Sequence, residues 1–192
     1  MRTKTIFCIW CVLAALAVRM PPARSQLRGT GFSPLNPAQV GARLETVIEC
    51  GFGYSPHEKY DVKVTLLEVV RGDKALERIK AASASNQPPN AGFEYILAHI
   101  KFEFFAKGAP GDCVHELRRE EFTAFSADGQ QYEAAMVTPP KPELSAKLRS
   151  GDSFEGWLAF QALQGGNKAL LRFVASVGSA VEQGGQVWFQ LY

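Results

Sequence analysis

The chain has 192 residues and is close to electrically neutral, with 21 Lys and Arg against 19 Asp and Glu and a net charge of +2. This balance gives it no electrostatic reason to bind nucleic acid or an anionic membrane surface, because such binding needs clustered bases. A chain of this length can bury roughly 70% of its unfolded surface in one core, so it needs neither a metal nor a disulfide lattice to fold.

Residues 1–25 have the layout of a secretory signal peptide. Arg2 and Lys4 form a basic start, residues 6–18 are an unbroken apolar run, and small residues precede a cleavage point after Ser25. The apolar run is shorter than the roughly 20 residues of a membrane-spanning helix, so an uncleaved anchor is the weaker alternative. Cleavage removes four bases and no acids, which leaves an exported chain, secreted or periplasmic, with a net charge of −2. No stable membrane insertion is expected after cleavage.

The exported chain is expected to begin with a flexible leader. Residues 26–42 are rich in Gly, Pro, Asn and Ser and show no periodicity. Residues 43–192 are assigned to a single domain, because no second hydrophobic segment of spanning length and no internal repeat follows.

The first clear pattern in the domain is a strand followed by a helix. Residues 60–70 alternate between apolar and polar side chains, which indicates a half-buried strand, and the alternation slips at Leu67 as at a bulge. Residues 72–83 change to a helical period. The face that this helix is expected to lay on the domain carries Ala75, Leu76 and Ile79.

The tripeptide Arg71-Gly72-Asp73 lies where this strand meets this helix. An integrin-type adhesion signal would need an exposed, extended loop tip, whereas Asp73 at a helix start can accept bonds from free backbone N–H groups. We therefore interpret the tripeptide as a structural boundary and not as an adhesion motif.

The rest of the chain reads as short strands separated by turns. Residues 93–105 alternate most clearly, with Ile96, Ala98, Ile100, Phe102 and Phe104 on one face. Further strands are predicted at residues 122–125, 132–137, 153–163, 169–176 and 186–192. Seven or eight strands with one short helix predict an all-β fold, a β-sandwich.

Two cysteines remain after cleavage, Cys50 and Cys113. In an oxidising compartment they could pair, and closing so long a loop would contribute about 4 kcal/mol in the chain-entropy model. The alternative is that they are two small buried hydrophobic residues far apart, and the sequence leaves both readings open.

No metal, cofactor or catalytic motif is evident in the sequence. Neither cysteine belongs to a C-x-x-C pair, and His57, His99 and His115 are dispersed. Cys113 and His115 form a conceivable nucleophile pair, but no orienting third group accompanies them. We therefore expect no cofactor, no metal and no enzyme activity.

Trp157 and Trp188 are the candidate partner-binding aromatics. Either could stack on a glycan or a peptide, although packing inside the sandwich is the commoner role of aromatic strand residues. Trp157 alternates with Leu158 and Phe160, so it cannot share the main core with them. Trp157 is therefore expected to be exposed or covered by the helix.

Residues 60–192 resemble a bacterial family of exported immunoglobulin-like domains of unknown function, within the superfamily of an immunoprotective extracellular antigen of mycobacteria. The resemblance rests on the Arg71-Gly72-Asp73-x-Ala75 junction, on "FSADGQQYEAAMV" and "GDSFEGWLAF", and on the closing "VWFQLY". These motifs are structural, and they imply an immunoglobulin-like sandwich without an enzymatic assignment. The expected function is a non-enzymatic binding or scaffold module for an unknown protein or glycan partner. The alternatives are a structural envelope component and, less favoured, a hydrolase with an unrecognised site.

Overall fold

The structure is a computed structural model that describes residues 30–50, 58–108, 111–166, 168–174 and 185–192. The predicted signal peptide, its cleavage point after Ser25, and His57 lie outside these residues. The described elements are β1 (Arg43–Cys50), β2 (Glu58–Arg71), α1 (Gly72–Ala82), β3 (Phe93–Ala106), β4 (His115–Leu117), the 3-10 helix η1 (Arg119–Glu121), β5 (Phe122–Phe125), β6 (Ala146–Leu148), β7 (Ser153–Leu163), β8 (Leu170–Phe173) and β9 (Val187–Gln190).

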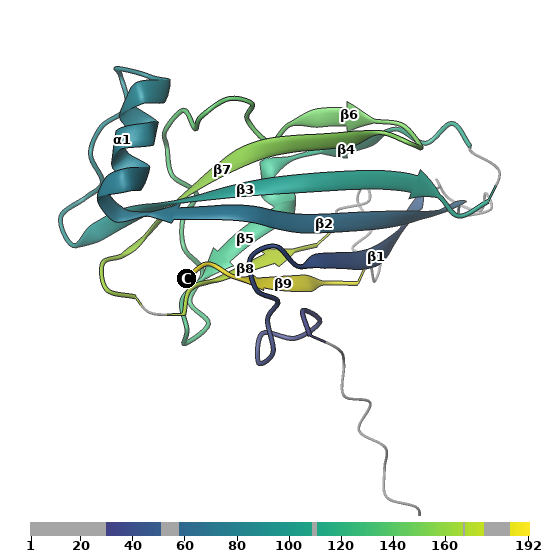
Figure 1. The fold of residues 1–192 in the computed structure, drawn as a ribbon, viewed down its shortest axis with the longest axis horizontal. Helices are drawn as coiled ribbons and strands as arrows, with labels where there is room; N and C mark the ends of the chain where they lie inside the picture. The colour runs from purple at the N-terminus through teal and green to yellow at the C-terminus, as the bar shows by residue number, and fades with distance from the viewer. Residues whose placement is uncertain (1–29, 51–57, 109–110, 167, 175–184) are drawn as a thin grey trace, which may run out of the picture.

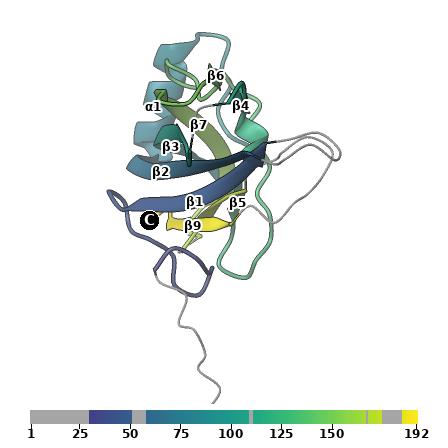
Figure 2. The same ribbon diagram turned by 90° about the vertical axis from the view of Figure 1, so that its right-hand side faces the viewer.

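Two antiparallel sheets enclose the main core between them (Figures 1 and 2). The larger sheet has the order β1-β2-β3-β7 and the smaller one the order β5-β8-β9, while β4 and β6 form a separate pair. The helix α1 lies at one end of the long strands β2 and β3 (Figure 1). The all-β sandwich with one short helix that the sequence predicts is confirmed.

The core is filled by the residues that the alternation places on one face. The fully buried side chains of β2 and β3 in this core are Tyr60, Val62, Val64, Leu66, Ile96, Ala98, Ile100, Phe102 and Phe104. They meet Phe173 and Phe189 of the opposite sheet. The predicted slip at Leu67 is a bulge, where the β2–β3 register shifts and the Leu67 side chain is left partly exposed.

The helix covers a second, smaller core on the outer face of the larger sheet. Ala75 and Ile79 are fully buried there and Leu76 packs at the margin, as the helical period predicts. The sheet contributes Tyr95, Leu97, Trp157 and Ala159 to this cluster. Near the helix, β3 and β7 are therefore buried on both faces.

Several predicted strand boundaries are corrected by the structure. Residues 132–137 do not form a strand, because the segment bridges β7 only at Ala134 and then leaves the sheet toward the helix. The strand β1 was not predicted, because its inward side carries the polar Thr46 between Leu44 and Ile48. The three-residue strands β4 and β6 are too short to show an alternation.

The flexible leader is also corrected for its described part, residues 30–42. The backbone N–H of Ala38 donates to the carbonyl of Trp188 at 2.8 Å, and the N–H of Gln190 donates to the carbonyl of Ala38 at 2.8 Å. Ala38 is fully buried. The segment thus pairs in parallel with β9, through backbone groups that composition does not reveal.

Asn86 fastens the end of α1 to the connection between β5 and β6. Its amide nitrogen donates to the carbonyls of Ile79 at 2.7 Å and Thr138 at 2.8 Å, and its amide oxygen accepts from the N–H of Thr138 at 2.9 Å. Its side chain is buried, so these bonds replace water that cannot reach the groups.

Replacing Asn86 with alanine is expected to lower the free energy of unfolding by about 2–3 kcal/mol, because the substitution leaves buried backbone groups without a partner. Urea unfolding would measure the change. Asn90→Ala in the same loop is the matched control, since Asn90 is exposed and should stay within about 0.5 kcal/mol of the natural chain. Equal stability of the two variants would show that the Asn86 bonds do not hold the helix.

Candidate functional site

Trp157, the first of the two predicted aromatics, lies beneath α1. It is 8% exposed, and its ring stacks on His99 with the centroids 4.5 Å apart. The guanidinium of Arg78, from α1, lies 5.3 Å from the ring centroid and is bonded to Glu68. Of the two positions expected for Trp157, exposed or covered by the helix, the structure shows the covered one. Trp157 therefore offers little surface to a partner.

A groove of about 390 Å³ nevertheless runs along the outer edge of β7 and past Trp157. It lies where the larger sheet meets β5, and its floor includes the core residues Phe122 and Phe160. The segment that leaves the sheet after Ala134 forms one wall and carries Met136, whose side chain is 94% exposed. A fully exposed methionine beside a concave apolar surface is a common feature of adaptable binding sites.

Charged and polar side chains also line the groove. Glu143 is exposed and has no ion-pair partner among the described residues, whereas Glu120 is paired with Arg119 at 3.8 Å. Tyr132 is buried, and desolvation raises the pKa of its phenol. The groove thus combines an apolar floor with a net negative charge among its lining side chains.

Trp188, the second predicted aromatic, lies on the outer face of the smaller sheet and is 9% exposed. Its ring lies 5.5 Å from that of Phe125, and the guanidinium of Arg172 packs over both rings, 4.9 Å from Phe125 and 5.7 Å from Trp188. The structure therefore does not bring the two tryptophans together into one binding surface. Each lies in its own cluster, on a different sheet.

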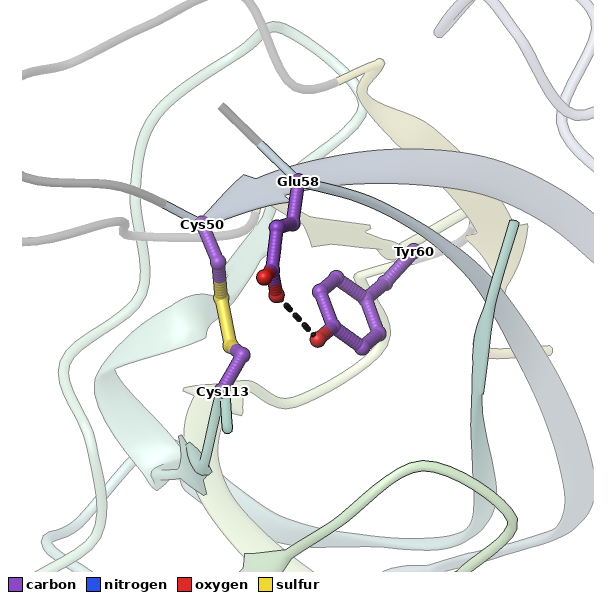
Figure 3. The surroundings of a disulfide bond; sticks show 4 residues. All are labelled: Cys50, Glu58, Tyr60 and Cys113. Carbon is purple, nitrogen blue, oxygen red and sulfur yellow. Dashed lines mark hydrogen bonds between the residues drawn. A yellow bond between two sulfur atoms is a disulfide. The ribbon is translucent and has the colours of Figure 1, made fainter. Parts of the chain in front are cut away.

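Cys50 and Cys113 form a disulfide, with their Cα atoms 6.2 Å apart (Figure 3). The bond joins the end of β1 to the segment that leads into β4. Beside it Tyr60 donates its hydroxyl to the Glu58 carboxylate at 2.6 Å. Burial, and then the bond to Glu58, raise the pKa of the Tyr60 phenol. Of the two readings that the sequence left open, the structure shows the paired one.

The hypothesis that Cys113 and His115 form a nucleophile pair is wrong. Cys113 has no free thiol while it is in the disulfide. His115 is 6% exposed, stacks on Phe102 and Phe104, and has its Nε2 atom 3.2 Å from the Glu121 carboxylate. This buried histidine packs and bonds inside the core, out of reach of a substrate.

The Arg71-Gly72-Asp73 tripeptide has a structural role. The guanidinium of Arg71 is bonded to the Glu94 carboxylate and donates to the carbonyls of Gly166 at 3.0 Å and Leu191 at 3.4 Å. Gly72 has a φ of +62°, a conformation that favours glycine. Arg71 is thus held inside the protein, which supports the interpretation of the tripeptide as a boundary.

Within the described part of the chain no group of three or more His, Cys, Asp or Glu side chains is placed to hold a metal ion. None of the helices in that part is long and apolar enough to cross a membrane.

No protein-family model matches the chain, and no curated protein matches it. Solved structures with a similar arrangement include the yjhA protein from Bacillus subtilis, with a TM-score of 0.48 and 10% identity over 79% of this chain and 98% of that one. MPT63, a secreted protein from Mycobacterium tuberculosis, has a TM-score of 0.43 and 12% identity over 80% of this chain and 97% of its own. The ycdA protein from Bacillus subtilis subsp. subtilis str. 168 has a TM-score of 0.47 and 13% identity.

The present chain covers only 38% of the ycdA protein, against 77% of itself. At this level of similarity none of these structures provides an activity, a ligand or a partner for the chain.

Three residues of the candidate sites were missed in the sequence, namely Met136, Glu143 and Arg172. Met136 lies in a segment predicted to be a strand, and Glu143 lies in a connection between strands. Nothing in either sequence pattern marks these two residues as part of a site. Arg172 does leave a signal, because it is the only charged residue of β8 and so must point away from the core. What it meets there depends on the pairing of β8 with β5 and β9.

Proposed function

We propose that the protein is a non-enzymatic binding or scaffold module that acts outside the cytoplasm and holds its partner in the groove along β7. The observation that carries this proposal is the exposed Met136 side chain beside a concavity of about 390 Å³. An isolated exposed methionine needs no explanation, but one that forms the wall of an apolar groove is suited to cover a partner's apolar group.

Export is part of the proposal and has two supports. The first is the signal-peptide layout of residues 1–25, with cleavage after Ser25. The second is the disulfide between Cys50 and Cys113, because such bonds persist in oxidising compartments and are rare in the cytosol. The partner is proposed to be a protein or a glycan and not nucleic acid, since the exported chain has a net charge of −2.

Two other functions compete with this one. A structural envelope component would need no concave surface, so the groove favours binding. A hydrolase would need a nucleophile or an acid–base pair at the cavity. The groove is lined by neither histidine nor cysteine, and of its two glutamates Glu120 is paired with Arg119, so we rank this function lower. We therefore keep the binding module as the leading proposal.

The test uses variants at the surface, since alanine at the buried Trp157 would disturb the helix as well. The exported chain, residues 26–192, is immobilised and exposed to envelope proteins and glycans of the source cell. Met136→Asp is expected to reduce capture of a specific partner at least about tenfold, because it removes apolar contact and adds a charge. The melting temperature should stay unchanged, since Met136 is almost fully exposed.

Leu163→Asp is the matched control, because Leu163 is 48% exposed and lies outside the groove lining. It should retain the partner. Equal capture by the natural chain, both variants and an unrelated sandwich domain would refute binding in the groove.

A further inference from the structure

The half-buried arginines of the described residues differ in what their guanidinium groups contact. Arg71 is bonded to Glu94 and to two carbonyls, and Arg119 is paired with Glu120. Arg172 has neither a carboxylate nor a carbonyl partner among the described residues, and its Nε atom is buried without a hydrogen-bond partner. An unpaired guanidinium in the middle of a sheet therefore needs a reason, because a buried donor without a partner is costly.

The position of Arg172 is fixed by aromatic rings. Its guanidinium packs on Phe125 and Trp188, which come from the strands on either side of β8. A cation held on ring faces is restricted in its rotamers before any ligand arrives. Its remaining N–H groups can still donate in the guanidinium plane, the geometry that matches a carboxylate.

Arg78 shows what this arrangement does when a carboxylate is present. It also packs on a tryptophan ring, that of Trp157, and its two terminal nitrogens donate to the two oxygens of Glu68 at 3.3 and 2.9 Å. Arg172 repeats the ring contact of Arg78 without the acid.

A turn with an exposed apolar side chain is bonded to the strand that carries Trp188. Leu35 is 95% exposed and lies in the turn whose Gly31 carbonyl accepts from the N–H of Trp188 at 2.7 Å. On the other side of Arg172, its cross-strand neighbour Thr123 also lines the groove along β7. One strand beside Arg172 is thus bonded to a turn with an exposed apolar residue, and the other contributes Thr123 to the groove.

We propose that Arg172, held on Phe125 and Trp188, binds the carboxylate of an Asp or Glu side chain of a partner protein, with Leu35, in the turn bonded to β9, as a contact for an apolar residue of the same partner. The proposal goes beyond the groove, because it names a second contact on the smaller sheet and the chemistry of its ligand. A single unpaired guanidinium matches one carboxylate. Polyanions such as nucleic acid or an anionic membrane need rows of bases.

The test follows the side-chain N–H signals of Arg172 and Trp188 by NMR while a blocked tetrapeptide is added. The peptide contains one glutamate beside one leucine, and a second peptide has glutamine in place of the glutamate. The glutamate peptide is expected to shift both signals saturably. The glutamine peptide should bind at least about tenfold more weakly, the ratio expected for the loss of one hydrogen bond to a charged group.

Variants assign the response to Arg172. Arg172→Gln should abolish the preference for glutamate, and Arg172→Lys, which keeps the charge on the rings but not the planar fork, should weaken it. Arg78→Gln is the matched control and should leave the preference unchanged. Met136→Asp should also leave it unchanged, so failure of the groove and failure of the Arg172 site are distinguishable.

Three results would overturn the proposal: equal responses to both peptides, a glutamate preference that survives in Arg172→Gln, or saturable shifts with inorganic phosphate but not with the glutamate peptide. The last would assign the arginine to a phosphate-bearing ligand instead. Should Arg172→Gln fail to fold, Arg172→Lys decides, because an unchanged preference in that variant contradicts a bidentate carboxylate contact.

Discussion

Replacing Ile79 with aspartate is expected to lower the free energy of unfolding by about 4 kcal/mol. Ile79 is fully buried in the cluster beneath α1, where it packs with residues of β3 and β7. The substitution removes a large apolar side chain and leaves a carboxylate with no partner in an apolar environment, and both effects are destabilising. Urea or thermal unfolding followed by circular dichroism would measure the change.

The helix supplies its own control for this variant. Ala81 is exposed two residues further along α1, so Ala81→Asp adds the same charge without burying it. We expect a cost below about 1 kcal/mol, mainly from a negative charge near the helix C-terminus. An unchanged melting temperature for Ile79→Asp would mean that α1 is not docked on the sheet.

Loss of the disulfide is expected to have an effect of similar size. Cys50 and Cys113 are separated by 63 positions, and a loop of that length corresponds to about 4 kcal/mol in the chain-entropy model. The double variant Cys50→Ser with Cys113→Ser should therefore unfold at a much lower urea concentration than the oxidised natural chain.

Treatment with a reductant distinguishes the effect of losing the disulfide from any other effect of the two serine substitutions. Dithiothreitol should lower the unfolding midpoint of the natural chain toward that of the double variant and leave the double variant unchanged. A natural chain that reacts with a thiol reagent before unfolding, or whose midpoint is insensitive to reductant, would show that the two cysteines are not paired.

The parts of the fold that were predictable from sequence are those with a local pattern. α1 and β3 each carry a regular period and β2 carries one as far as Leu67, and the residues predicted to face inward are buried or packed at the margin of a core. Tyr60, Tyr95 and Leu97 are buried too, but the alternation did not identify them. Residues 132–137 are predicted as a strand because they form a short, mainly apolar stretch between turn signals. What removes them from the sheet is the contact between Thr138 and Asn86, which are distant in sequence and carry no periodic signal.

The candidate sites were predictable only in part, for the same reason. Trp157 could be placed outside the main core, because its neighbours Leu158 and Phe160 occupy the inward positions of the same strand. The disulfide depends on a Cα separation, which the sequence does not contain. The contact between Arg172, Phe125 and Trp188 requires the register of three strands, and the groove depends on where one irregular segment leaves a sheet.

The parallel bridge between Ala38 and Phe189 bears on when the protein can fold. It joins the segment before β1 to β9, so the smaller sheet is incomplete until β9 has been synthesised. Long-range pairing of this kind slows folding, because the loop-closure entropy must be met before the contact forms. On a ribosome all four strands of the larger sheet would emerge before β9, so the smaller sheet would be the last part of the sandwich to close.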